Sequence, residues 1–96
     1  MNTVKIGGNK IKLVYSSPND WNVNGLGRCY VDKIVINEEL NNDMKANTFL
    51  HELLHYIVDL NGLVIQDNET EVSVLANVIH AFINDNKKLV KQIWGL

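Results

Sequence analysis

The chain has 96 residues and a formal net charge of −2, with 46% hydrophobic and 21% charged residues. This length and composition are typical of one small globular domain, residues 1–96, and they exclude an intrinsically disordered chain. The only local basic cluster, Lys87, Lys88 and Lys91, is short, so we expect no nucleic-acid partner.

We expect neither a signal peptide nor a membrane span in this sequence. Residues 1–10 lack an apolar stretch, and no later run approaches the roughly 18 apolar residues that a transmembrane helix needs. The single cysteine, Cys29, excludes a disulfide within the chain and is expected to be an ordinary half-buried residue. We therefore expect a soluble, cytoplasmic protein with no membrane partner.

The first third of the chain predicts a small sheet of three or four strands, antiparallel or mixed. Gly7-Gly8-Asn9 separates two short alternating runs, which is typical of a hairpin, and a tight turn at Asp32 separates two more. The four runs cover residues 3–6, 10–15, 28–31 and 33–36.

The periodicity then changes to that of a helix. Asn41, Asn42 and Asp43 are suitable N-caps. Residues 44–60 follow a helical pattern, and Asn61-Gly62 suits its C-terminal end. The fold class predicted here is α+β.

A second helix is expected from Asn68 or Glu69 to about Asn84, because apolar side chains recur there at helical spacing. These side chains are Val72, Leu75, Val78, Ile79 and Phe82. The tail predicts a short last helix that ends at Gly95 and is anchored on the core by Trp94.

The strongest feature is the segment from His51 to His55, which reads H-E-L-L-H. Residues i and i+4 lie on one face of a helix, so both imidazoles can reach one ion. Zinc accepts nitrogen ligands and keeps one position open for water in catalytic sites. Glu52 lies about 100° further around the helix, where it can take a proton from a zinc-bound water, whose pKa falls from about 15.7 towards about 7.

A helical wheel supports a site at this position. Both histidines fall at the border between the apolar arc and the polar arc, where a cleft would open. Thr48, Glu52 and Asp59 lie on the polar arc.

Two carboxylates at the start of the second helix are candidates for a third ligand. Glu71 falls within the apolar arc of that helix, and Glu69 lies to one side of it. Periodicity slightly favours Glu71, whereas a ligand beside the core would suit Glu69, so both remain candidates on this ground.

Residues 51–59 resemble the active-site helix of thermolysin-like gluzincins, which share the pattern H-E-L-x-H-x-x-x-D. The third ligand of that family is a Glu preceded by Asn, and Asn68-Glu69 matches this dipeptide. The order of elements also resembles small phage and prophage metallopeptidases related to the ImmA/IrrE type, with an HExxH helix and then a helix that opens N-E-x-x-V. The resemblance covers about residues 27–82.

The resemblance implies a minimal zincin, encoded by a phage or prophage, that binds Zn²⁺ through His51, His55 and Glu69, with Glu71 as the alternative ligand. It also implies that Asn68 contacts a ligand histidine. Ser73 stands where the family has an Asp. The residue that would stabilise the oxyanion is unassigned: Tyr15, Tyr30 and Tyr56 are candidates, although packing roles are favoured for each. His80 is expected to be a solvated histidine.

Motif and resemblance together predict a zinc metallopeptidase that hydrolyses peptide bonds of a peptide or protein substrate, with Glu52 as the general base. Zincins bind the peptide by adding it to an exposed strand, and residues 33–36 are expected to form that edge. One alternative is a zincin-fold binding or regulatory module with little or no turnover, because the small chain leaves little room for a second lobe. Another is a helical interaction domain without metal.

Overall fold

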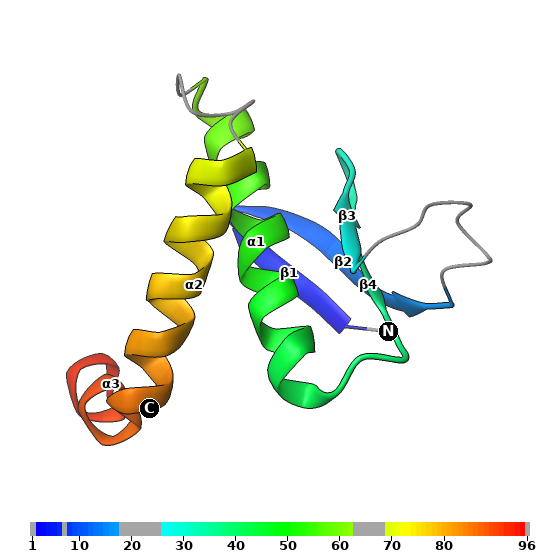
Figure 1. Cartoon of the computed structure of the whole chain (residues 1–96). Helices are drawn as coiled ribbons and strands as arrows, with labels where there is room; N and C mark the ends of the chain where they lie inside the picture. Colours follow the sequence, from blue (N-terminus) through cyan, green and yellow to red (C-terminus); the bar gives the residue numbers. More distant parts are fainter. Residues whose placement is uncertain (1, 7, 18–25, 63–68, 96) are drawn as a thin grey trace.

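The computed structural model describes residues 2–6, 8–17, 26–62 and 69–95 (Figure 1). Four strands precede three helices, and the HExxH segment lies on the first helix, so the predicted α+β class is confirmed. The elements in chain order are β1 (Asn2–Ile6), β2 (Asn9–Ser16), β3 (Gly27–Cys29), β4 (Lys33–Asn37), α1 (Asn42–Leu60), α2 (Glu69–Asp85) and α3 (Lys87–Trp94).

The four strands form one mixed sheet in the order β1-β2-β4-β3. β1 and β2 pair antiparallel, as the predicted hairpin requires, and β3 and β4 also pair antiparallel. β2 and β4 pair in parallel, with Leu13 opposite Ile34.

β4 is therefore an interior strand, and the prediction that residues 33–36 form the exposed edge is wrong. Ile34, Val35 and Ile36 are all buried, so this strand is apolar on both of its faces. Strands of this kind occupy the middle of a sheet, where both faces are covered. The edge strand beside β4 is the three-residue β3.

The hydrophobic core lies between the sheet and α1. Ile11, Ile34 and Ile36 form its centre, and Phe49 and Leu53 of α1 pack against them. α1 contacts β3 and β4 on one side and α2 on the other. Figure 1 shows the resulting layers, with α1 between the sheet and α2.

α1 begins at Asn42, two residues before the predicted start, with the candidate cap Asn41 in front of it, and it ends at Leu60 as predicted. The Asn41 side chain accepts a hydrogen bond of 2.8 Å from the backbone N–H of Met44, which caps the N-terminus. Asn61 is the C-cap, and Gly62 follows with a φ of 62°, a conformation that glycine adopts at low cost.

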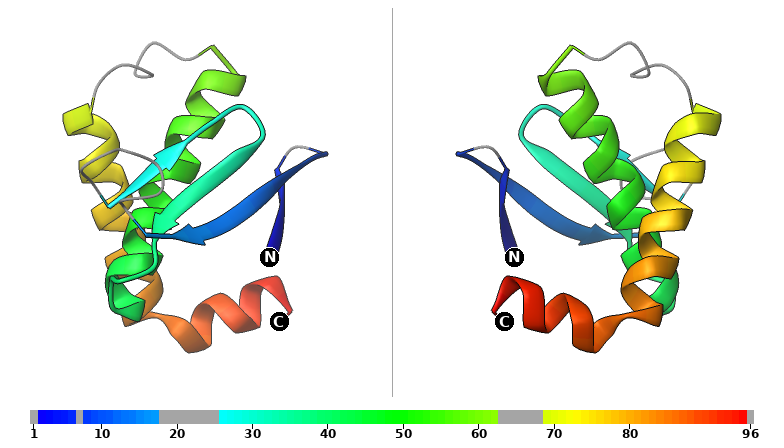
Figure 2. Two further views of the ribbon diagram at one scale, coloured as in Figure 1. Left: turned by 90° about the vertical axis from the view of Figure 1, so that its right-hand side faces the viewer. Right: turned by 90° about the vertical axis from the view of Figure 1, so that its left-hand side faces the viewer.

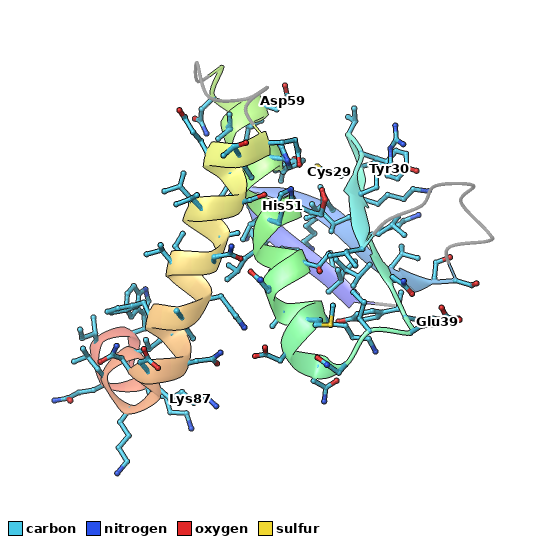
Figure 3. All side chains as sticks on the ribbon, in the orientation of Figure 1. Cys29, Tyr30, Glu39, His51, Asp59 and Lys87 are labelled. Carbon is cyan, nitrogen blue, oxygen red and sulfur yellow. The ribbon has the colours of Figure 1, made fainter. Side chains whose placement is uncertain are left out.

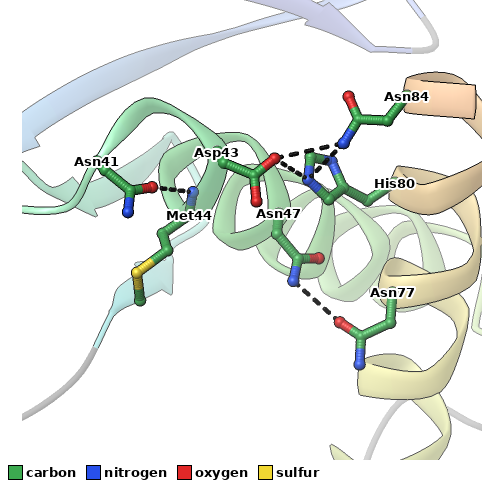
Figure 4. A network of polar contacts seen from close by, with 7 residues as sticks. All are labelled: Asn41, Asp43, Met44, Asn47, Asn77, His80 and Asn84. Atoms are coloured by element: carbon green, nitrogen blue, oxygen red, sulfur yellow. Dashed lines mark hydrogen bonds and ion pairs between the residues drawn. The ribbon is translucent and has the colours of Figure 1, made fainter.

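Polar side chains join α1 to α2 near the start of α1 (Figure 4). A ring nitrogen of His80 lies 2.9 Å from Oδ1 of Asp43, and Asn84 donates to the same oxygen at 3.3 Å. Asn47 donates to Asn77 at 2.9 Å. The side chain of His80 is only 14% exposed, so the expectation of a solvated histidine is wrong: the approach of Asp43 from the other helix covers it.

We expect Asp43→Asn to lower Tm at pH 7 by an amount on the order of a few degrees. The hydrogen bond from His80 holds the pKa of Asp43 below its ordinary value. A carboxyl whose pKa is lower in the folded than in the unfolded state stabilises the fold above its unfolded-state pKa. This contribution is lost as the pH falls through the folded-state pKa.

The difference in Tm between wild type and Asp43→Asn should therefore shrink as the pH falls below about 4. Thermal melts across this pH range measure it. Asp32→Asn is the control, because it removes the same charge from an exposed residue of the β3–β4 turn. A difference that stays constant down to the lowest pH would contradict the assigned contact.

α3 confirms the predicted last helix and its end at Gly95, where φ is 69°. The anchoring role of Trp94 is wrong, since this side chain is 67% exposed. The reason is the turn at Asn86, after which α3 contacts the end of α2 and leaves its own apolar side chains uncovered. No helix in the described part of the chain is long and apolar enough to cross a membrane.

Candidate metal centre

His51 and His55 lie on successive turns of α1 and direct their rings to a common point. Their Nε2 atoms are 3.1 Å apart, and the ring centroids are separated by 4.8 Å. Both side chains are half-buried, which agrees with the predicted position at the border of the apolar arc. Figure 3 shows His51 on the part of α1 that lies beside α2.

Glu69, the first residue of α2, brings a carboxylate to both rings. Its Oε2 lies 3.2 Å from Nε2 of His51, and its Oε1 contacts Nε2 of His55. The carboxylate is 70% exposed, so it closes the group from the solvent side. The structure thus brings together the three residues that the family resemblance implies as ligands.

The buried face of α2 explains why Glu69 rather than Glu71 meets the histidines. Val72 and Ala76 are the buried residues of this helix. On a wheel with about 100° per residue, Glu69 lies about 20° from Ala76, whereas Glu71 lies about 100° from Val72 and about 140° from Ala76. Leu75 is 40% exposed, so the apolar arc that favoured Glu71 is wider than the face that packs against α1.

Glu52 stands beside the two histidines on the side of the sheet. One ligand atom from each of His51, Glu52 and His55 lies within 4.8 Å of the others, a grouping that can hold a metal ion. The side chain of Glu52 is only 7% exposed, because the arc expected to be polar faces β3 rather than open solvent. Burial raises the pKa of this carboxyl, and the neighbouring histidines act in the opposite direction.

Gly27 permits the close approach of β3 to α1 at this point. A Cβ atom at Gly27 would lie 2.7 Å from Cγ2 of Thr48, 2.9 Å from the carbonyl oxygen of Val35 and 3.4 Å from Cγ of Glu52. The first two separations are too short for a side chain. Sequence reasoning did not single out Gly27, since its neighbours give no sign that a helix passes over it.

We expect Gly27→Ala to lower the free energy of unfolding by about 1–3 kcal/mol, the usual cost of inserting a methyl group into a packed contact. Urea denaturation measures the change. The double variant Gly27→Ala/Thr48→Ser should recover part of the loss, because serine removes Cγ2 while the contact with Val35 remains, and Thr48→Ser alone is the control. Wild-type stability in Gly27→Ala would show that the two elements do not pack this closely.

Ser73, which stands where the gluzincin pattern has an Asp, contacts the ring of His51. Its Oγ lies 3.5 Å from Nδ1 of His51, at the outer limit of a hydrogen bond. A partner on Nδ1 leaves Nε2 available as a metal ligand and fixes the orientation of the ring. Asn68, which the resemblance implies in a similar role, lies outside the described residues.

Two of the three separations between the ligand atoms are compatible with a metal ion such as zinc, whereas Oε1 of Glu69 lies closer to Nε2 of His55 than a tetrahedral edge. In a tetrahedral site with bonds of about 2.0–2.1 Å, two ligand atoms are about 3.3–3.4 Å apart. The separations of 3.1 Å between the two Nε2 atoms and 3.2 Å between His51 and Glu69 are close to this edge length. Two nitrogens and one carboxylate oxygen are also a donor set that catalytic zinc sites use.

Two cavities flank the group, and both are lined by Glu52 and Glu69. The first, of about 420 Å³, is lined mainly by small and polar residues, which are Gly27, Asn47, Thr48, Ser73 and Asn77 together with Leu26. The second, of about 550 Å³, adds larger side chains, which are Arg28, Tyr30, Val31, Tyr56 and Leu60. Within the described part of the chain, the buried Oδ1 of Asn47 has no hydrogen-bond partner.

The second cavity distinguishes between the three tyrosines that are candidates for stabilising the oxyanion. Tyr30 and Tyr56 line it beside Glu52, and Tyr56 also packs against the core. The ring of Tyr15 instead lies 5.3 Å from Nζ of Lys45, away from both cavities. Tyr30 and Tyr56 are therefore the two candidate tyrosines that lie in the cavity beside Glu52 and His55.

Cys29 lines the same cavity at the end of β3 and is half-buried, as expected. Burial raises the pKa of its thiol to about 11, and the charges of Glu52 and Asp59 act in the same direction. The group is a neutral thiol near pH 7, so it lacks the thiolate that a cysteine nucleophile requires.

The chain matches no known protein family, and comparison with curated proteins and with solved structures gave no match either. The interpretation of the site therefore rests on its own residues. An HExxH group on a helix that follows a small sheet is compatible with a zincin.

Proposed function

We propose that this chain is a zinc-dependent metallopeptidase, with His51, His55 and Glu69 as zinc ligands and Glu52 as the general base. One observation carries the proposal. Two imidazole Nε2 atoms 3.1 Å apart on α1 face a carboxylate from α2, and a second, buried carboxylate stands beside them.

The two carboxylates take different roles because their surroundings differ. Each oxygen of Glu69 faces one imidazole nitrogen, which is the position of a ligand. Glu52 is buried against β3, and one of its carboxylate oxygens lies within 4.8 Å of a ring nitrogen of each histidine. From there it can reach a water molecule next to the ion without replacing a ligand.

A bound zinc ion would polarise the scissile carbonyl and lower the pKa of the attacking water towards neutrality. Glu52 accepts the proton of that water and then passes it to the leaving amine. Burial suits Glu52 to this exchange, because a carboxylate in a dry site is a stronger base than one in water. Ser73 holds the ring of His51 through Nδ1.

The edge strand β3 is the part of the sheet that a peptide substrate can extend. It ends at Cys29, and both cavities are lined by residues of this strand or its ends. A peptide added to an edge strand gains backbone hydrogen bonds whatever its sequence and places alternate side chains in pockets. We expect an extended or unfolded segment as substrate, with smaller side chains in the first cavity and larger apolar ones in the second.

The test combines metal analysis with an activity assay. Purified protein should carry about one zinc ion per chain and degrade an unfolded protein such as reduced casein, and a chelator should stop both. Protein that binds no metal, and whose Tm does not respond to a chelator, would overturn the proposal. One zinc per chain without cleavage of any unfolded substrate would instead identify the binding or regulatory module.

A further inference from the structure

Basic side chains gather on the face of the sheet that is turned away from α1. Directly paired strand residues point to the same side of a sheet. Lys5 pairs with Lys10, Lys12 with Lys33, and Arg28 with Val35. The alternate residues Ile11 and Ile34 belong to the core under α1, so the alternation places the five cations on the opposite face of the sheet. The left view of Figure 2 shows this face of the ribbon. Arg28, on the edge strand, also lines the second cavity.

The five cations form a diagonal stripe across the strand order β1-β2-β4-β3. Lys5 and Lys10 lie at one end, Lys12 and Lys33 in the middle, and Arg28 at the other end. With about 4.8 Å between strands and about 6.6 Å between alternate residues, this basic stripe is about 20 Å long. It holds five of the nine lysines and arginines of the chain.

The basic stripe carries one sign of charge only. None of the residues in the four strands is Asp or Glu. Among the described residues, the ion pairs are made by histidines, and none involves the five cations. All five are exposed except Lys33, which is half-buried.

This arrangement costs stability. Like charges directly opposite each other on neighbouring strands repel, and the sheet has two such pairs, Lys5 with Lys10 and Lys12 with Lys33. Lysines that protect a sheet from edge-to-edge association belong on edge strands. Lys10, Lys12 and Lys33 lie on the interior strands β2 and β4. A face that only needed to be soluble would mix both signs of charge.

We propose that the basic stripe binds the phosphate backbone of single-stranded nucleic acid. Lysine ammonium groups are point charges that suit phosphate, and they carry little information about bases. Tyr30 stands at one end of the stripe, with its ring centre 5.1 Å from Nζ of Lys33 and 5.6 Å from the guanidinium carbon of Arg28. An aromatic ring among cations is a surface on which a base can stack.

Other anionic partners suit the stripe less well. A membrane-binding face needs apolar side chains that insert, but Val35 is buried and Val14 half-buried on this face. An acidic peptide pairs along a strand edge, whereas the stripe crosses the strands. The expectation of no nucleic-acid partner rested on the lack of a long basic cluster in the sequence, and the sequence does not show that the strand register places separate cations on one face.

The test is fluorescence anisotropy with labelled oligothymidine at low salt. With about 0.7 for each phosphate contact on a single strand, five contacts give a slope of log K against log salt of about −3.5. Lys10→Gln/Lys12→Gln/Lys33→Gln should weaken binding at least about tenfold and reduce the slope to about −1.4. The matched control, Lys87→Gln/Lys88→Gln/Lys91→Gln, removes the same charge from α3 and should bind within about twofold of wild type.

Thermal melts verify folding, and the sheet variant should be at least as stable as wild type because it relieves repulsion. If it does not fold, Lys5→Gln/Arg28→Gln on the edge strands replaces it and should also weaken binding. The proposal is overturned if oligothymidine does not bind, or if both triple variants lose affinity equally. It is also overturned if polyglutamate competes as well as oligothymidine, or if vesicles of phosphatidylserine bind and oligothymidine does not.

Discussion

Glu52→Gln is expected to lower kcat for peptide hydrolysis by about 10²–10⁴-fold, the range that a general base contributes. Glutamine keeps the shape of the side chain and cannot accept the proton of water. Burial disfavours the charged form of Glu52 and so raises the pKa of this carboxyl. The neutral amide of Glu52→Gln avoids this cost, so the variant should have an unchanged or a higher Tm. The loss of activity would then belong to the chemical step and not to folding.

Zinc content and Tm should be measured together with kcat, because they distinguish a loss of turnover from a loss of zinc or of the fold. A variant that keeps its zinc and its fold but loses turnover assigns the proton transfer to Glu52. Ser73→Ala is a useful companion, because it removes the contact to Nδ1 of His51 and leaves the base in place. Equal cleavage by wild type and Glu52→Gln would show that this carboxylate is not the base.

Glu69→Ala is expected to remove the zinc ion, with affinity falling by more than about 100-fold, since the loss of an outer partner of a ligand alone costs 10–100-fold. The carboxylate faces both imidazole nitrogens, so its removal leaves only two protein ligands. Metal analysis after dialysis against a weak chelator measures the change, and activity should disappear together with the metal.

Glu71→Ala is the matched control, because it removes the same side chain and charge from the same helix two residues later. It should keep one zinc per chain and most of the activity. The opposite pattern, with zinc lost in Glu71→Ala and kept in Glu69→Ala, would transfer the ligand role to Glu71. Zinc retained in both variants would mean that Glu52 completes the site together with the histidines.

The helices could be predicted from the sequence because their ends depend on local residues. The Asn41 cap, Gly62 after α1 and Gly95 after α3 each act within one turn of the chain, and the structure has all three. The HExxH spacing is local in the same sense. It determines by itself that His51 and His55 share a face.

What could not be predicted depends on contacts between distant segments. Residues 33–36 were expected to form an exposed edge, but pairing with both β2 and β3 makes β4 an interior strand. The sequence predicts a solvated His80, but in the structure Asp43 of α1 lies next to its ring. On α2, the exposed Leu75, Val78 and Phe82 hide which side faces α1, and for this reason periodicity slightly favoured Glu71 over Glu69.

The attachment of α2 has a consequence for folding. This helix packs mainly on α1, and much of its apolar surface is exposed. Polar contacts hold the pair at one end, through Asp43 and His80, and Glu69 meets the histidines at the other. An ion bound there would join the two helices as a crosslink does. By mass action it would add about 2.7 kcal/mol when free metal is 100 times Kd. The supply of metal would then control whether the second helix stays docked, as well as whether the site can react.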